Sequence, residues 1–183
     1  LQHDSGDPFY SGNQYKTAVG ADIKIGLGSN FNVDATVNPD FGQIEVDPAV
    51  VNLSAFETFF QEKRPFFIEG REITSFQLSS GGNSFARDNL FYSRRIGRSP
   101  HHYPDIDEDN NEYANIPDNT TILGALKLTG KTKKGMSIGI IESLTAEEKA
   151  DLFLNGTDSS EVVEPATNYF VARVKQDMND NNT

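Results

Sequence analysis

The chain has 183 residues, no cysteine and a formal net charge of −11. This acidic balance argues against a nucleic-acid-binding surface, which needs a basic face toward phosphates, and the lack of cysteine excludes disulfides and thiolate metal sites. There is no apolar run of about 18 residues for a transmembrane helix, and the first residues do not resemble a signal peptide, so we expect a cytosolic chain, a mature product or a fragment.

Strict alternation of apolar and polar residues predicts a β-hairpin over 16–38. Gly28, Ser29 and Asn30 have turn composition, and Pro39 ends the second strand because it cannot donate to a β-ladder. The apolar positions are Val19, Ala21, Ile23, Ile25 and Leu27 in the first strand and Phe31, Val33, Ala35 and Val37 in the second. One face of this hairpin is therefore apolar and the other polar.

The segment 40–84 mixes aromatic and charged residues in an unusual way. Its part 53–70, LSAFETFFQEKRPFFIEG, holds five phenylalanines beside several charged side chains. Helical spacing of apolar residues predicts a short helix over 50–61, and Pro65 is expected to stop it. The residues that follow, up to 84, read as a loop.

The region 88–177 contains further strands separated by long polar stretches. We expect a strand within 88–100, where residues 90–96 alternate, a hairpin over 122–141 with its turn at 130–135, and a last strand at 167–177. The stretches 101–119 and 145–165 read as long polar loops. About six strands result, with short turns inside hairpins and long loops between them, as in outer-membrane barrels. A soluble antiparallel sandwich or meander shows the same alternation.

Four motifs resemble the DUF5916 family of Bacteroidetes-type outer-membrane proteins, in which this region usually follows a carbohydrate-binding domain of family 9 type. They are ATVNPDFGQIEVDPAVVNLSAFETFFQEKRPFFIEG at 35–70, LFYSRRIGR at 90–98, TTILGALKLTGKTKKGMSIGIIESLTAEE at 120–148 and EPATNYFVARVKQD at 164–177. The resemblance implies an all-β fold, with antiparallel hairpins forming part of an outer-membrane β-barrel of the TonB-dependent-receptor-like type. It implies no catalytic residue. The whole of 1–183 would be a partial barrel region.

A barrel interior is polar and needs filling, so we expect 40–84 to be a plug-like segment with a short helix or turn in the lumen. Its charged residues would pair with wall residues such as Asp34, Lys24 or Arg94. An amphipathic helix and turn on a soluble sheet is the other interpretation. The candidate ligand or lumen residues are Glu57, Glu62, Lys63, Arg64, Glu69, Arg94 and Arg95.

The acidic stretch DIDEDNNE offers a weak calcium site, because hard oxygen ligands at alternate positions suit Ca²⁺. Its candidate ligands are Asp105, Asp107, Asp109 and Glu112. The stretch lacks the glycine and the final glutamate of an EF-hand, so a solvated loop is favoured, and no other cofactor is expected. His101 and His102 are not expected to share a metal. Glu45 and Asp47 could serve glycoside hydrolysis, but solvated carboxylates are the favoured interpretation.

The resemblance implies an outer-membrane protein and, by association with the carbohydrate-binding domain, binding or passage of a glycan-related solute. Its expected partners are outer-membrane lipid, a glycan, and other outer-membrane or periplasmic proteins. A soluble carbohydrate-active β-domain and a structural barrel in a surface complex are the alternatives. No nucleophile triad, phosphate-binding glycine loop or dinucleotide motif is present, so the chain does not read as an enzyme.

Overall fold

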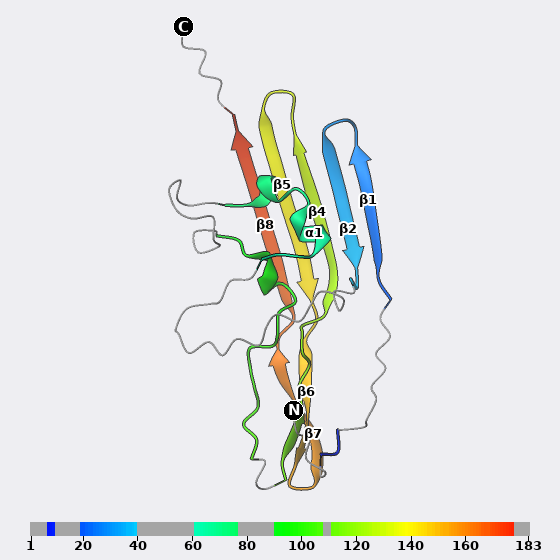
Figure 1. Cartoon of the computed structure of the whole chain (residues 1–183), viewed down its shortest axis with the longest axis vertical. Helices are drawn as coiled ribbons and strands as arrows, with labels where there is room; N and C mark the ends of the chain where they lie inside the picture. The colour runs from blue at the N-terminus through cyan, green and yellow to red at the C-terminus, as the bar shows by residue number, and fades with distance from the viewer. Residues whose placement is uncertain (1–6, 10–18, 40–60, 77–89, 108–110, 178–183) are drawn as a thin grey trace.

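The computed structural model describes residues 7–9, 19–39, 61–76, 90–107 and 111–177. Its main element is a five-stranded antiparallel sheet in the order β1-β2-β4-β5-β8 (Figure 1). The strands are β1 Ala21–Leu27, β2 Phe31–Val37, β4 Ile122–Lys131, β5 Met136–Thr145 and β8 Thr167–Gln176. The all-β class, both predicted hairpins and the last strand are confirmed.

A smaller sheet, β3-β6-β7, extends from one end of the main sheet (Figure 1). It consists of β3 Tyr113–Asn115, β6 Glu148–Leu154 and β7 Thr157–Glu164. The interpretation of 145–165 as a polar loop is therefore wrong, and the predicted loop 101–119 contains a strand. Ala150, Leu152 and Val163 form the core of this sheet. Its outward-facing residues are polar, so the composition of 145–165 resembles that of a loop although the residues form strands.

The strand expected within 88–100 is also wrong. Its described residues, 90–100, form an irregular path with one short 3-10 helix, Ser93–Arg95. Ile96 is fully buried although its neighbours are not, and Gly97 has a φ of +78° that a continuous strand does not allow. The alternating residues at 90–96 therefore do not form a strand. Ile96 is buried because it anchors a turn.

Two one-turn helices, α1 Pro65–Ile68 and α2 Arg71–Thr74, lie on one face of the main sheet (Figure 1). Pro65 begins α1 and does not end a helix, since a proline at the first helical position loses no hydrogen bond. The residues after Glu69, expected to be a loop, include α2. The helix expected at 50–61 lies almost wholly outside the described residues.

The two faces of the main sheet differ in chemistry and in exposure. The strand register places one set of apolar residues on a single face across all five strands. Many of these side chains are exposed, and the most exposed are Ile23, Ile25, Leu27, Val37, Leu126, Leu144, Phe170 and Val174. We call this surface the apolar face.

The opposite face, the polar face, carries α1 and α2. Its buried polar residues are Asp34, Thr36, Lys127, Thr129 and Ser143. The segments 61–76 and 90–98, which we call the covering segments, lie over this face. Their residues Phe67 and Ile96 pack there against Ile122 and Ile141 of the sheet. The core cluster of the main sheet therefore lies between the polar face and these two covering segments. Among the described residues, no helix is long and apolar enough to cross a membrane.

Candidate functional site: the covered polar face

The centre of the covered face is Lys127, whose side chain is 1% exposed. Asp34 lies opposite Lys127 in the β2–β4 register, and its Oδ2 is 3.3 Å from Lys127 Nζ. The ammonium also donates to the carbonyl oxygens of Phe66 at 2.5 Å and Glu69 at 2.9 Å, and it lies 4.8 Å from the centre of the Phe66 ring. A buried lysine needs this many partners because removing an ammonium from water is costly.

A second cation of the main sheet holds α2 in the same way. Arg173 on β8 donates through Nη1 to the carbonyl oxygens of Glu72 at 3.1 Å and Ile73 at 3.0 Å. The last carbonyls of a helix have no partner inside the helix and favour a nearby cation. Lys127 serves the carbonyls at the end of α1, and Arg173 serves those of α2. The sheet thus supplies one cation to each one-turn helix.

Two glycines make room for this packing. A Cβ added at Gly139 on β5 would lie 2.9 Å from Thr74 Cγ2 and 3.0 Å from Ile73 Cγ2. A Cβ at Gly70, between α1 and α2, would lie 3.0 Å from Thr129 Cγ2, and Gly70 has a φ of +69°. The close approach of helix to sheet therefore requires glycine at both positions.

Before α1, Glu62 and Arg64 form a buried ion pair. Arg64 donates through Nε and Nη2 to the two carboxylate oxygens of Glu62, each at 2.8 Å. Its remaining donors reach the carbonyls of Ile96 at 2.6 Å and Ser93 at 2.7 Å, and its guanidinium lies 4.4 Å from the Phe67 ring centre. This bidentate pair ties the segment before α1 to the segment around the 3-10 helix.

The environment of Glu62 sets its protonation. Burial alone would raise the pKa of this carboxyl, but hydrogen bonds and charge from Arg64, with a further hydrogen bond from Ser93, outweigh burial and hold the pKa below its ordinary value of 4.5. Glu69 also has a lowered pKa, because Lys24 donates to its carboxylate. Both carboxylates are therefore ionised at neutral pH.

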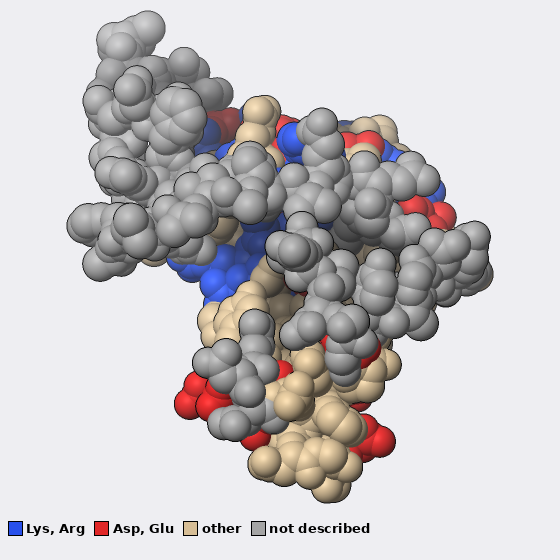
Figure 2. Space-filling model, turned by 60° about the horizontal axis from the view of Figure 1, so that its bottom comes forward, with Lys and Arg blue, Asp and Glu red and all other residues tan. Residues whose placement is uncertain are grey.

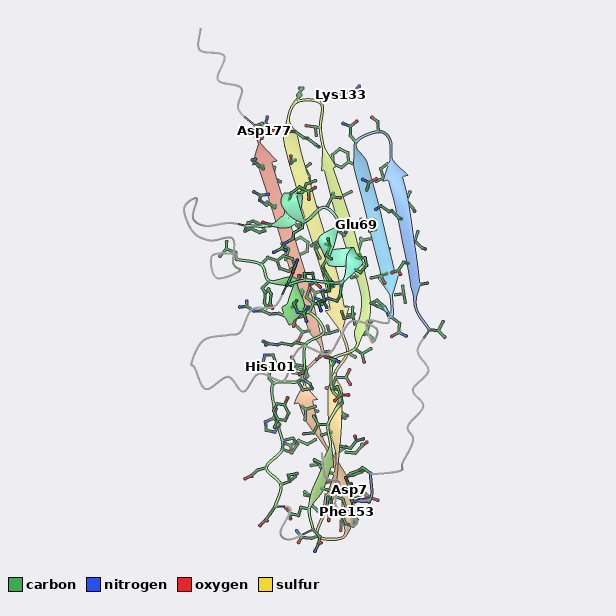
Figure 3. All side chains as sticks on the ribbon, in the orientation of Figure 1. Asp7, Glu69, His101, Lys133, Phe153 and Asp177 are labelled. Atoms are coloured by element: carbon green, nitrogen blue, oxygen red, sulfur yellow. The ribbon has the colours of Figure 1, made fainter. Side chains whose placement is uncertain are left out.

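The predicted lumen residues meet different outcomes. Glu69 pairs with Lys24 of β1, as expected, and lies over the sheet in Figure 3. Glu62 pairs with Arg64 of its own segment and with no described sheet residue, and Asp34 pairs with its sheet neighbours Lys127 and Lys24. Lys63 is exposed. Glu57 lies outside the described residues, as do Glu45 and Asp47.

The predicted arginines contribute to the covering segments. Arg94 donates through Nη1 to the carbonyl of Gln61 at 2.8 Å, which joins the two covering segments a second time. Arg95 is exposed at its side chain, and its carbonyl accepts a hydrogen bond from Tyr169 of β8 at 3.4 Å. Sequence reasoning missed Lys127 and Arg173. The available signal was a cation at a polar-face position of an otherwise regular strand.

The acidic stretch lies beside the smaller sheet, and Figure 2 shows acidic side chains on both sides of the end turned toward the viewer, which is otherwise uncharged. Glu112 uses its carboxylate oxygens to accept from the Asp107 amide at 3.0 Å and from Asn155 Nδ2 at 3.2 Å. Asp109 lies outside the described residues. Among those described, no three His, Cys, Asp or Glu side chains converge to hold a metal ion.

His101 and His102 attach the stretch that follows Arg98 to β7. His101 Nδ1 lies 2.5 Å from Glu164 Oε2, and His102 Nε2 lies 2.9 Å from Glu161 Oε1. The His102 amide also donates to the Val163 carbonyl at 3.2 Å. This stretch therefore runs along the free edge of β7, at the junction of the two sheets where Figure 3 labels His101.

The comparison with protein families gives one result. A family model described as Domain of unknown function (DUF5916) matches residues 4–183. The chain belongs to the DUF5916 family. This confirms the resemblance drawn from the four motifs. The DUF5916 chain matched no curated protein and no solved structure.

The charged groups of the DUF5916 site attach the two one-turn helices to the sheet. Each described charged group at its centre, Glu62, Arg64, Asp34 and Lys127, is already engaged by another protein group. What the arrangement does chemically is hold two one-turn helices against the polar face of a sheet whose other face is apolar and exposed.

Proposed function

We propose that this DUF5916 chain forms part of the wall of an outer-membrane β-barrel, with α1 and α2 filling part of the interior. The observation that carries the proposal is the reversed polarity of the main sheet. A soluble sheet buries its apolar face and leaves the polar face to water. Here the polar face holds the buried groups, including Lys127, while Ile25 is 51% exposed and Phe170 is 63% exposed on the apolar face.

The strand dimensions agree with a membrane role. β4, β5 and β8 have ten residues each. At about 3.3 Å per residue, a ten-residue strand tilted by about 40° spans roughly 25 Å along the membrane normal, which is the height of the apolar band of such barrels. The proposal requires the outer edges of β1 and β8 to pair with further strands, because an open edge is not tolerated in lipid.

Two buried hydroxyl groups support a polar interior. Thr36 and Ser143 face the same side of the sheet, and within the described part of the chain their oxygens have no hydrogen-bond partner. Both lie in register with Ala125, one strand to each side. Buried hydroxyls of this kind are normally satisfied by ordered water. A hydrated interior would supply it.

The test compares two single cysteines on β1. Cysteine at Ile25 lies on the apolar face, and cysteine at Asp22 lies on the polar face of the same strand. With the protein in its membrane, a water-soluble thiol reagent should modify the Asp22 position and spare the Ile25 position. The protein should also resist alkaline extraction. Equal modification of both sites in a freely soluble protein would refute the membrane proposal.

Binding or passage of a glycan-related solute is the proposed role of this barrel. The prediction is tested in proteoliposomes by uptake of oligosaccharides through the complete protein. Lys127→Met should weaken the attachment of α1 to the polar face. Uptake that rises in this variant would support passage. A tight barrel in both forms would favour the structural alternative, and cleavage of the sugar would favour a carbohydrate-active domain.

A further inference from the structure

On the apolar face of the five described strands, the register places one charged residue, Glu142 on β5. Within the described strands, the register places on this face only apolar side chains and glycines, apart from Glu142, the neighbouring Asn168 and Gln176 at the end of β8. Glu142 does not lie beyond the apolar residues of its own strand, because Ile140 and Leu144 flank it on the same face. A carboxylate within an apolar surface that contacts lipid requires an explanation.

Asn168 on β8 answers part of that requirement. Its Nδ2 donates to Glu142 Oε1 at 2.5 Å, across neighbouring strands. This contact uses one of the two N–H groups of the amide and one of the two carboxylate oxygens. The second N–H and the second oxygen have no partner among the described residues. The pair thus offers one donor and one acceptor side by side on the surface.

Such a pair is self-complementary. A two-fold axis beside it brings the free N–H of each Asn168 to the free oxygen of the other copy's Glu142. Two further hydrogen bonds then form across the axis, one from each copy. Around the pair lie exposed apolar side chains that the same axis would pack together, namely Leu126 at 49%, Leu144 at 45% and Phe170 at 63% exposure. Polar groups joined across a membrane contact in this way add stability to association.

We propose that the surface around Glu142 and Asn168 binds a second copy of this chain in a two-fold dimer within the membrane. The inference rests on the proposed membrane location of the apolar face. The rest of that face, including β1 and β2, contacts lipid.

The experiment uses single cysteines in the complete protein, in its own membrane and in a background without other cysteines. Phe170 lies directly opposite Glu142 in the β5–β8 register, in the same row across the sheet. The variant Phe170→Cys should form a disulfide-linked dimer under mild oxidation. Ile23→Cys is the matched control, because it lies in the same row of the same face, is 58% exposed, and is four strands away on β1. It should stay monomeric.

Glu142→Leu in the Phe170→Cys background removes the polar pair without placing charge in lipid. We expect dimer formation to fall about tenfold, since two membrane hydrogen bonds are lost. No cross-link at Phe170→Cys, equal cross-linking at both positions, a product with the mass of a different protein, or no effect of Glu142→Leu would each overturn the proposal. Alkaline extraction of the same samples separates this failure from failure of the membrane proposal.

Discussion

Lys127 of β4 and Asp34 of β2 face each other in the sheet register, and their charged atoms are 3.3 Å apart beneath α1. The Lys127 side chain is 1% exposed and that of Asp34 is 11% exposed, so water screens this pair very little. The same ammonium holds two carbonyls of the covering segment. One buried cation therefore joins two strands and a helix.

Replacing Lys127 with methionine should lower the free energy of unfolding by about 3–5 kcal/mol, because Asp34 is left as a buried charge without its main partner. Chemical denaturation of the folded protein in detergent measures this change. Lys131→Met is the matched control, because Lys131 pairs with Asp177 on an exposed surface and its loss should have no measurable effect. Equal effects of the two substitutions would contradict the central role of Lys127.

Gly139→Ala should displace α2 from the sheet. The added methyl group would meet Thr74 and Ile73 at about 3 Å, and such overpacking costs roughly 1–3 kcal/mol. Hydrogen exchange of the Ser75 amide, which donates to Arg71, should accelerate. Gly26→Ala on β1 is the control, since its nearest neighbouring atoms are 4.0 Å from the new Cβ, and it should leave exchange unchanged. Unchanged exchange in Gly139→Ala would show that α2 does not depend on this close approach.

The Glu62–Arg64 pair should make stability fall in acid. The pKa of Glu62 is lower in the folded chain than its ordinary value of 4.5, so its contribution is fully present above that value and disappears as the pH falls through the folded pKa. Thermal unfolding measured between about pH 6 and pH 3 should show this loss. Glu62→Gln should flatten the curve in that range. A variant with an acid dependence identical to that of the parent would exclude Glu62 as a source of it.

Lys24→Gln should have no measurable effect on unfolding. Lys24 contacts Glu69 closely, but both side chains are more than half exposed, at 57% and 52%, and exposed ion pairs add little stability. Denaturation in parallel with Lys127→Met checks this prediction. A loss as large as that of Lys127→Met would show that the Lys24–Glu69 contact, rather than burial, holds α1 in place.

Much of the main sheet was predictable from sequence, because alternation has a period of two and each strand has one apolar face. The same rule failed at 145–165, where β6 and β7 display mostly polar residues. A local signal was present there: Asn155 and Gly156 both have positive φ, at 51° and 80°, and Asn-Gly between strands is a strong hairpin marker. At 90–98, alternation of side chains did not correspond to any strand partner.

The candidate site was predictable only in part. The pairing of Glu69 with Lys24 follows from charge and from the expected contact between segment and wall. The hydrogen bonds from Lys127 and Arg173 to backbone carbonyls could not be predicted in this way. Every residue has a backbone carbonyl, so the sequence does not mark which ones accept. Likewise, Gly139 is one of many glycines until the position of Thr74 is known.

The place of the covering segment in the chain has a consequence for folding order. β2 ends at Val37 and its sheet neighbour β4 begins at Ile122, whereas the β1–β2 and β4–β5 hairpins close through short turns. Joining β2 to β4 closes a loop of about 85 residues, at an entropic cost near 4 kcal/mol. The two hairpins can form early, but their union is slow. Because α1 and α2 lie within that loop, they are synthesised before β4, and the sheet assembles around a segment that is already present.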